Sequence, residues 1–176
     1  CIRDRSNPAL DRFLNGCGIQ CVRSAVGERY VIEEMKKHGA NVGGEESGHM
    51  VLSDYGKTGD AMTAALVLAQ GLLKSGKKMS ELFPLFEPML RLRADSKFAT
   101  KEAMLAAFEL PEFQAAIHQA EQTVAGKGKV LVRKSGTEPK IQVWVWSDDR
   151  NLAEKVNDEV SSVLEKAAGF ETKKLV

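Results

Sequence analysis

Residues 129–146 read KVLVRKSGTEPKIQVWVW, and the fold of the second half of the chain can be predicted outward from this segment. Residues 129–133 form a short, mostly apolar run that is typical of a strand. In residues 141–146 the aliphatic side chains alternate with glutamine and tryptophan, a period of two that also indicates a strand. Trp144 and Trp146 share one face of that strand, where they cover the sheet or stack on a ligand. The polar heptapeptide at residues 133–139 therefore connects two strands.

The connecting heptapeptide concentrates groups that bind phosphate. Arg133 offers a planar guanidinium that can grip two phosphate oxygens. Ser135 and Thr137 add hydroxyl donors, and Gly136 permits a sharp turn that directs successive backbone N–H groups into one concavity. The alternative is a hairpin connection with incidental charge. Because such connections rarely need all these residue types together, the sequence predicts an anion site here.

Helical patterns flank this hairpin on both sides. Residues 100–108 and 112–124 form one helical region that is interrupted at Pro111, and residues 89–94 are extended. Apolar residues recur at helical spacing between residues 152 and 164. The order of strand, helix, strand, strand and helix predicts an α+β domain with its helices on one face of a small sheet.

The first half of the chain has a different pattern. Residues 28–37 predict a helix that Gly39 closes, and a short helix begins at Asn7. Residues 61–73, capped by Thr58 or Asp60, are apolar on nearly every face, so we expect this helix to be buried on several sides. Short strands are expected at residues 19–22 and 50–52, and a loose end at residues 1–7.

The Pro-flanked stretch at residues 84–88 is the predicted domain boundary. The predicted domains are therefore residues 1–83 and 89–176, joined by this linker. The sequence pattern places helices and short strands before the linker and the α+β domain after it.

A second polar loop lies in the first half, where residues 43–49 read GGEESGH. Its glycines let the backbone approach a ligand closely. Glu45 and Ser47 present an acceptor and a hydroxyl that suit the vicinal hydroxyls of a sugar, and His49 adds an imidazole. The alternative is a polar turn that joins two strands. Residues 42–48 are in either case too polar to be core.

Composition excludes several classes of function. The 25 Lys and Arg residues and 24 Asp and Glu residues leave a net charge of +1, which argues against a protein that coats nucleic acid or an anionic membrane. No apolar run approaches the roughly 18 residues that span a bilayer. The three cysteines lack the spacing of a zinc site, so we expect reduced thiols in a cytoplasmic protein. The chain begins at Cys1 rather than Met, which suggests a fragment.

Four segments in the order 26–31 (VGERYV), 43–49 (GGEESGH), 57–60 (KTGD) and 133–139 (RKSGTEP) carry a family resemblance. With them the chain, from Ser6 to its end, resembles the C-terminal part of the α-D-phosphohexomutase superfamily and is most similar to its bacterial phosphoglucosamine mutase branch. The resemblance implies the C-terminal portion of an α/β domain 3, which recognises sugar, followed by a small, TBP-like α+β domain 4, which holds phosphate.

The resemblance also assigns roles to residues. It places His49 near the transferring phosphoryl group as the catalytic residue of this part. The substrate-binding residues that it implies are Glu45, Ser47, Arg133, Ser135, Gly136 and Thr137. Glu46 departs from the Gln or Met that is common in relatives at that position, which bears on the choice of sugar.

The family interconverts glucosamine 6-phosphate and glucosamine 1-phosphate through a phosphoserine and a bisphosphate. The phosphoserine loop and the Asp-rich loop that binds Mg²⁺ are not in this sequence, so it is expected to bind no metal and to be inactive alone. The implied partners are a hexosamine phosphate and the remaining mutase domains, with a homodimer as an option for the full-length form. A phosphomannomutase or phosphoglucomutase fragment, or a non-catalytic anion-binding module, remains the alternative.

Overall fold

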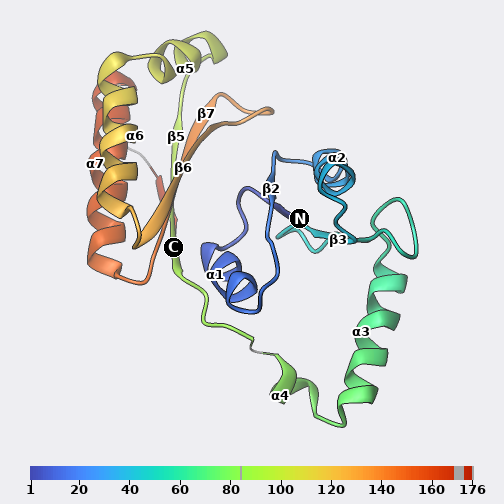
Figure 1. The fold of residues 1–176 in the computed structure, drawn as a ribbon. Coiled ribbons are helices and arrows are strands. Elements are labelled where there is room, and N and C mark those ends of the chain that lie inside the picture. The colour runs from blue at the N-terminus through green and yellow to red at the C-terminus, as the bar shows by residue number, and fades with distance from the viewer. Residues whose placement is uncertain (84, 169–172, 176) are drawn as a thin grey trace. The chain divides into compact units, whose positions relative to one another are not determined.

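The computed structural model describes residues 1–83, 85–168 and 173–175 (Figure 1). The chain divides into two compact units, Cys1–Pro88 and Met89–Val176. Both units combine helices with a sheet, as expected from the alternating patterns. Within the described residues, none of the helices has the length and apolarity needed to cross a bilayer.

The first unit is built on a sheet with the strand order β2-β1-β3-β4. Its strands are β1 (Ile2–Arg3), β2 (Arg23–Ser24), β3 (Val42–Gly44) and β4 (Met50–Leu52). Strand β1 runs parallel to both β2 and β3, whereas β3 and β4 form an antiparallel hairpin. The turn of that hairpin is the GGEESGH loop, so the loop leaves the sheet between two paired strands.

The helices of the first unit begin and end as the sequence signals indicate. They are α1 (Pro8–Gly16), α2 (Glu28–His38), α3 (Ala61–Ser75) and α4 (Met79–Leu82). The side chain of Asn7 accepts the Ala9 N–H at the start of α1. Gly39 ends α2 with φ 64°, a left-handed conformation that glycine adopts without strain. Asp60, rather than Thr58, caps α3.

Three expectations for the first unit are wrong. Residues 1–7 are not a loose end, because Ile2 is buried in β1 and the Cys1 ammonium donates to the Val42 carbonyl over 2.7 Å. The strand expected at 19–22 lies instead at Arg23–Ser24. The start of the GGEESGH loop belongs to β3, where Gly43 is buried. Two- and three-residue strands are set by pairing between distant segments, which a local pattern does not reveal.

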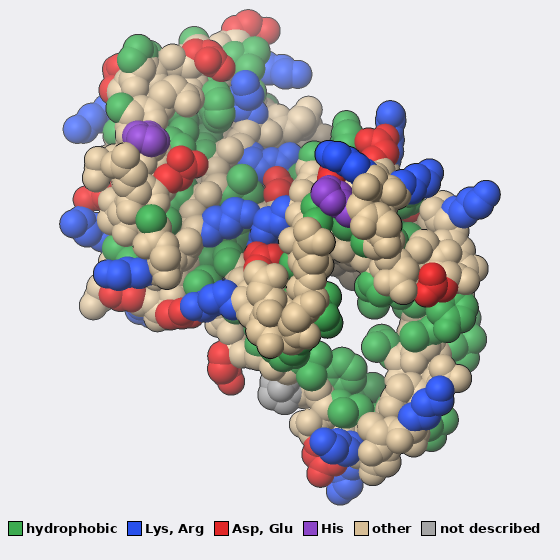
Figure 2. Space-filling view, in the orientation of Figure 1, with side chains coloured by type: hydrophobic (Ala, Val, Ile, Leu, Met, Phe, Trp, Pro, Cys, Tyr) green, Lys and Arg blue, Asp and Glu red, His purple; other side chains and the backbone are tan. Residues whose placement is uncertain are grey.

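Helix α3 is also less buried than its composition suggests. Ala64 is its one buried residue among those described, while Met62, Leu66 and Leu73 are 70%, 65% and 82% exposed. Figure 2 shows hydrophobic side chains at the surface along this helix. An almost uniformly apolar helix predicts neighbours on several sides, but here α3 packs on β4.

The second unit is an antiparallel sheet with the strand order β6-β7-β5-β8. Its strands are β5 (Leu90–Lys97), β6 (Gly128–Lys134), β7 (Lys140–Ser147) and β8 (Lys173–Leu175). Strands β6 and β7 confirm the hairpin predicted around residues 133–139. Strand β8 was not expected, because its three residues carry no alternating pattern.

Three helices cover one face of this sheet, as predicted (Figure 1). They are α5 (Lys101–Phe108), α6 (Pro111–Val124) and α7 (Arg150–Ala168). The core between them and the sheet includes Phe113, Val143 and Val156, none of which is exposed. On β7 the rings of Trp144 and Trp146 are buried and stack with 6.0 Å between their centroids. Their burial favours a role in covering the sheet.

Candidate functional site

The GGEESGH loop is a closed turn held by its own backbone. The Glu45 N–H donates to the His49 carbonyl over 3.0 Å, and the Gly48 N–H donates to the Glu45 carbonyl over 3.0 Å. Gly48 has φ 92°, which a residue with a side chain rarely adopts. The backbone therefore presents the side chains of residues 45, 47 and 49 from one end of the hairpin.

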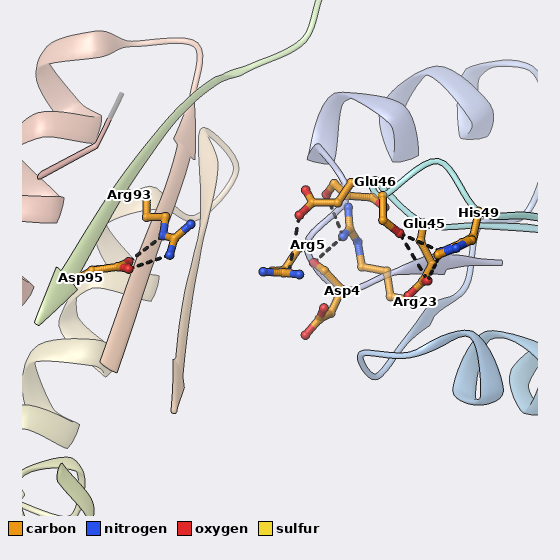
Figure 3. A network of polar contacts seen from close by, with 10 residues as sticks. Asp4, Arg5, Arg23, Glu45, Glu46, His49, Arg93 and Asp95 are labelled. Atoms are coloured by element: carbon orange, nitrogen blue, oxygen red, sulfur yellow. Dashed lines mark hydrogen bonds and ion pairs between the residues drawn. The ribbon is translucent and has the colours of Figure 1, made fainter. Parts of the chain in front are cut away.

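Those three side chains lie in contact (Figure 3). His49 Nδ1 is 3.3 Å from Glu45 Oε2 and 3.2 Å from Ser47 Oγ, and Ser47 Oγ is 3.4 Å from Glu45 Oε2. The Glu45 side chain is 6% exposed, whereas that of His49 is 62% exposed. A shielded carboxylate thus orients an accessible imidazole and hydroxyl, which can donate and accept hydrogen bonds with a polar ligand. The structure brings together all three residues that the sequence singled out in this loop.

A second layer of charged residues, which the sequence analysis did not identify, supports the loop. Arg5 Nε lies 3.5 Å from Glu46 Oε1, which ties the segment after β1 to the loop. Arg23 donates to the carbonyls of Asp4 and Ser6 over 2.8 and 2.9 Å and pairs with the Asp11 carboxylate (Figure 3). These partners are distant in sequence, and the consecutive charged residues at positions 3–5 are the signal that could have indicated them.

A hollow of about 270 Å³ lies beside the loop in the same unit. Leu10 and Phe86 form part of its apolar wall, and Glu45 and Glu46 contribute to its rim. Its volume is close to the lower end of the range for small-molecule sites, about 300–1,000 Å³. The arrangement provides carboxylates over an apolar surface, which suits a polyhydroxylated ring.

The turn between β6 and β7 is the second candidate site. The Ser135 N–H donates to the Lys140 carbonyl over 2.9 Å, which closes the turn. The hydroxyls of Ser135 and Thr137 lie 3.5 Å apart, and Ser135 Oγ accepts the Glu138 N–H over 3.3 Å. Arg133 is the penultimate residue of β6, paired with Gln142 of β7. The predicted residues therefore lie in this turn and at the end of the strand that leads into it.

Gly136 differs from its expected role. Its φ lies outside the left-handed region, and a Cβ added there would meet no atom within 4 Å. The turn is made by successive bends at residues 136–139 that other residues can adopt as well. The absence of a side chain at Gly136 therefore leaves room beside the hydroxyls rather than relieving backbone strain.

Ion pairs next to this turn were not predicted. Lys140 Nζ lies 2.5 Å from Glu138 Oε2 and 3.4 Å from Asp95 Oδ2, and Arg93 donates to both oxygens of Asp95 over 2.6 Å. The hydrogen bond from Lys140, followed by its charge, lowers the pKa of Glu138. The bond to Glu138 in turn raises the pKa of Lys140 against the opposing effect of burial. Burial alone would raise the pKa of Asp95, but the hydrogen bonds and charge of Arg93 and the charge of Lys140 outweigh it, so this pKa is lowered.

Among the described residues, no three His, Cys, Asp or Glu side chains cluster in a way that could hold a metal ion. The donors present therefore do not fit Mg²⁺. Cys1, Cys17 and Cys21 are free cysteines. Burial raises the pKa of the Cys21 thiol to about 11, with a further contribution from Asp11, so this thiol is protonated near neutral pH.

Two histidines and one aspartate outside the two loops have partners within the chain. His38 lies 3.2 Å from Glu34 one turn earlier in α2, and His118 lies 2.9 Å from Gln122 in α6. Asp60 caps α3. These contacts account for the three residues without a ligand.

Comparison with known families covers most of the chain. The model for phosphoglucomutase/phosphomannomutase, alpha/beta/alpha domain III, matches residues 4–89. The model for the phosphoglucomutase/phosphomannomutase C-terminal domain matches residues 89–163. The two family matches adjoin at residue 89, which is also where the second compact unit begins.

Curated relatives carry the same domains within longer chains. A phosphoglucosamine mutase from Paramagnetospirillum magneticum is 43% identical over 164 residues, which are 93% of this chain and 36% of the relative. A phosphoglucosamine mutase from Novosphingobium aromaticivorans is 44% identical over 163 residues, with the same coverage. This chain thus spans about a third of the length of these relatives.

Solved structures share the fold at low sequence identity. An N-acetylphosphoglucosamine mutase from Aspergillus fumigatus has a TM-score of 0.77 at 16% identity, covering 95% of this chain and 38% of that one. The same enzyme in complex with GlcNAc-6P and magnesium has a TM-score of 0.72 at 15% identity, again covering 95% of this chain and 38% of that one. These likenesses establish the architecture of both units.

Proposed function

This chain belongs to the phosphoglucomutase/phosphomannomutase family, of which it carries domains III and IV, and from that premise we propose that it works as part of a phosphoglucosamine mutase. Family members of this kind are phosphohexomutase isomerases. The proposed substrates are glucosamine 6-phosphate and glucosamine 1-phosphate, and the proposed location is the cytoplasm. The curated relatives at 43–44% identity support the amino sugar over glucose or mannose.

We assign sugar recognition to the GGEESGH loop. The shielded carboxylate of Glu45 accepts hydrogen bonds from sugar hydroxyls, and Ser47 donates or accepts beside it. His49, which is accessible and held by Glu45, is assigned a place near the transferring phosphoryl group. The hollow next to Glu45 and Glu46 supports this assignment because it provides an apolar surface for the ring.

We assign the non-transferred phosphate to the turn between β6 and β7. Arg133 grips phosphate oxygens with its guanidinium, Ser135 and Thr137 donate from their hydroxyls, and the Gly136 backbone approaches closely. The observation that carries the proposal is the pair of hydroxyls 3.5 Å apart in a turn that begins two residues after Arg133.

The reaction that we propose for the whole enzyme proceeds in two transfers. A phosphoserine gives its phosphoryl group to the substrate, the bisphosphate reorients, and the other phosphate returns to serine. Phosphoryl transfer depends mainly on positioning. A site that binds phosphate oxygens and a loop that binds pairs of hydroxyls can hold the bisphosphate in either orientation. Mg²⁺ would supply charge stabilisation in this chemistry. We expect the chain alone to show no turnover.

Calorimetric titration of the 176-residue chain with glucosamine 6-phosphate tests the clamp. Loss of one or two charge-assisted hydrogen bonds predicts about tenfold or greater weakening for Arg133→Ala. Arg150→Ala, which removes an exposed arginine at the start of α7, is the matched control and leaves the affinity unchanged. Equal affinities for wild type and Arg133→Ala would refute the assignment.

The same titration separates the alternatives. A mutase part binds glucosamine 6-phosphate more tightly than inorganic phosphate and loses that preference in Glu45→Ala. A non-catalytic anion-binding module binds both ligands alike and is indifferent to Glu45→Ala. Tighter binding of glucose 6-phosphate or mannose 6-phosphate than of the amino sugar would instead favour a phosphoglucomutase or phosphomannomutase.

A further inference from the structure

Four side chains of alternating charge connect the centre of the second sheet to the phosphate turn. They are Arg93 and Asp95 on β5, Lys140 at the start of β7 and Glu138 in the turn, and we call them the β5–β7 brace. Arg93 donates to both Asp95 oxygens, Lys140 lies 3.4 Å from Asp95, and Lys140 lies 2.5 Å from Glu138. The Arg93–Asp95 end of the brace is drawn in Figure 3.

The brace is shielded at its centre and open at the turn. The side chains of Asp95 and Lys140 are 8% and 14% exposed, whereas that of Glu138 is 53% exposed. Strand pairing sets this order, since Asp95 opposes Gln142 in the β5–β7 register and so lies diagonally across from Lys140. The sheet thus fixes the positions of Asp95 and Lys140. Lys140 in turn holds the Glu138 carboxylate through their ion pair.

The negative charge of Glu138 is unfavourable for binding a dianion in this turn. Its backbone N–H donates to Ser135 Oγ, so its carboxylate belongs to the same turn as the hydroxyls that we assign to phosphate. A carboxylate without a neutralising partner at that distance would repel a phosphate, because the two charges interact across a partly desolvated surface. Lys140 contacts this carboxylate, and its hydrogen bond and charge contribute most to the lowered pKa of Glu138, with a smaller contribution from the charge of Lys97.

We propose that Lys140 is a positioning residue for the phosphate turn: it neutralises and holds the Glu138 carboxylate so that the turn accepts a dianion, and Asp95 with Arg93 holds Lys140 in place. Lys140 acts on the anion through Glu138 and does not itself touch phosphate. This inference rests on the proposed phosphate-binding role of residues 133–137.

The test is a cycle of variants of the 176-residue chain, titrated with inorganic phosphate at constant pH and ionic strength. Lys140→Met removes the main neutralising partner of Glu138 and weakens phosphate binding about tenfold. Glu138→Gln alone changes the affinity by less than about twofold. The double variant Lys140→Met, Glu138→Gln returns to within about twofold of wild type, because the repulsive charge is gone.

Further variants separate positioning from general loss of structure. Lys140→Arg keeps the affinity, since it conserves the charge. Asp95→Asn weakens binding about threefold, and Glu138→Gln reverses that loss as well, so the result does not depend on Lys140→Met folding normally. Lys155→Met is the matched control because it removes a lysine from an exposed pair with Glu159 in α7, and it leaves phosphate affinity unchanged.

Each contrary outcome is distinct. Equal phosphate affinity for wild type and Lys140→Met overturns this inference and leaves the proposed function standing. A double variant as weak as Lys140→Met shows that Lys140 contacts the anion directly, which also overturns the inference. A wild-type chain that binds no phosphate overturns the proposed function and this inference with it.

Discussion

The two units of the chain bury their apolar residues to different extents. In the second unit a continuous core runs between the sheet and its three helices, from Leu92 on β5 to Leu164 on α7. In the first unit the core cluster of Val31, Met35 and Val51 lies between α2 and the sheet. Among the described residues, the large hydrophobic side chains that are exposed lie in the first unit, with Leu105 as the exception.

This difference indicates which unit contributes more to the stability of the chain. Apolar burial is the main favourable term in folding, at roughly 25 cal/mol per Å². The second unit has a core of the kind that supports cooperative folding by itself, whereas α3 in the first unit contributes little buried surface. We therefore expect the first unit to unfold at lower denaturant concentration, and the following changes test that order.

The largest effect is expected from truncation in the second core. Phe113 is fully buried and contacts Phe108 edge to face, with 6.0 Å between the ring centroids. Phe113→Ala should destabilise the second unit by about 3–5 kcal/mol, because it removes a large side chain and leaves a cavity. Urea unfolding followed by tryptophan fluorescence reports on this unit, since Trp144 and Trp146 both lie in it. Leu66→Ala on the exposed face of α3 is the control, followed by far-UV circular dichroism because the tryptophans do not report on the first unit. A loss there above about 1 kcal/mol would contradict the comparison.

A smaller loss is expected where the first unit is tightly packed. A Cβ at Gly43 would lie 2.3 Å from Met35 Sδ and 2.7 Å from Val31 Cγ1. Gly43→Ala should cost about 1–3 kcal/mol, since both side chains must move to accommodate the methyl group. Hydrogen exchange of the α2 amides measures the effect in this unit. The control, Gly71→Ala, adds its methyl group in open space within α3, and there a stability equal to or above wild type is expected.

One hydrogen bond joins two of the motifs in the first unit. Glu28 Oε1 accepts the Gly59 N–H over 2.9 Å, which links the first turn of α2 to the loop before α3. Glu28→Ala should destabilise this unit by about 1 kcal/mol, the usual net value of such a bond. Glu28→Gln keeps an acceptor oxygen and should recover much of the loss. The free energy of unfolding from urea melts of both variants checks the prediction, and equal values for them would assign the effect to something other than this bond.

The smallest effect is a pH dependence confined to the second unit. The pKa of Asp95 is lowered, so its contribution to stability is complete above the ordinary carboxyl pKa and is lost as the pH falls through the lowered value. The stability difference between wild type and Asp95→Asn should therefore be constant from about pH 7 to pH 5 and shrink below about pH 4. Acid unfolding of the two proteins measures it. A difference that persists unchanged to pH 2 would show that the Asp95 charge contributes nothing.

Sequence patterns predicted the second unit better than the first. The period of two in residues 141–146 and the helical spacing in residues 152–164 are local signals, and both elements form where expected. The strand at Ile2–Arg3 has no such signal, because two residues become a strand only through partners 21 and 42 positions away. The burial of α3 was overestimated for a related reason, since composition shows that a helix needs neighbours but not whether it has them.

The candidate site likewise contains residues that local sequence patterns predicted and residues that they did not. Glu45, Ser47 and His49 stand close together in sequence, and the structure places them in contact, as it does Ser135 and Thr137. The side chains that support them come from other segments. Arg5 pairs with Glu46, and Asp95 pairs with Lys140. Both contacts depend on which strands lie side by side, and the sequence patterns did not predict that.

The placement of β1 has a consequence for how the first unit opens. This strand of two residues lies between β2 and β3, and its hydrogen bonds run both ways, from the Ile2 and Asp4 amides to Val22 and Ser24 and from the Gly44 amide to the Cys1 carbonyl. Loss of the pairing at β1 therefore separates β2 from the hairpin that bears the GGEESGH loop. The amide protons of residues 2, 4 and 44 should exchange with solvent together, as a single cooperative event.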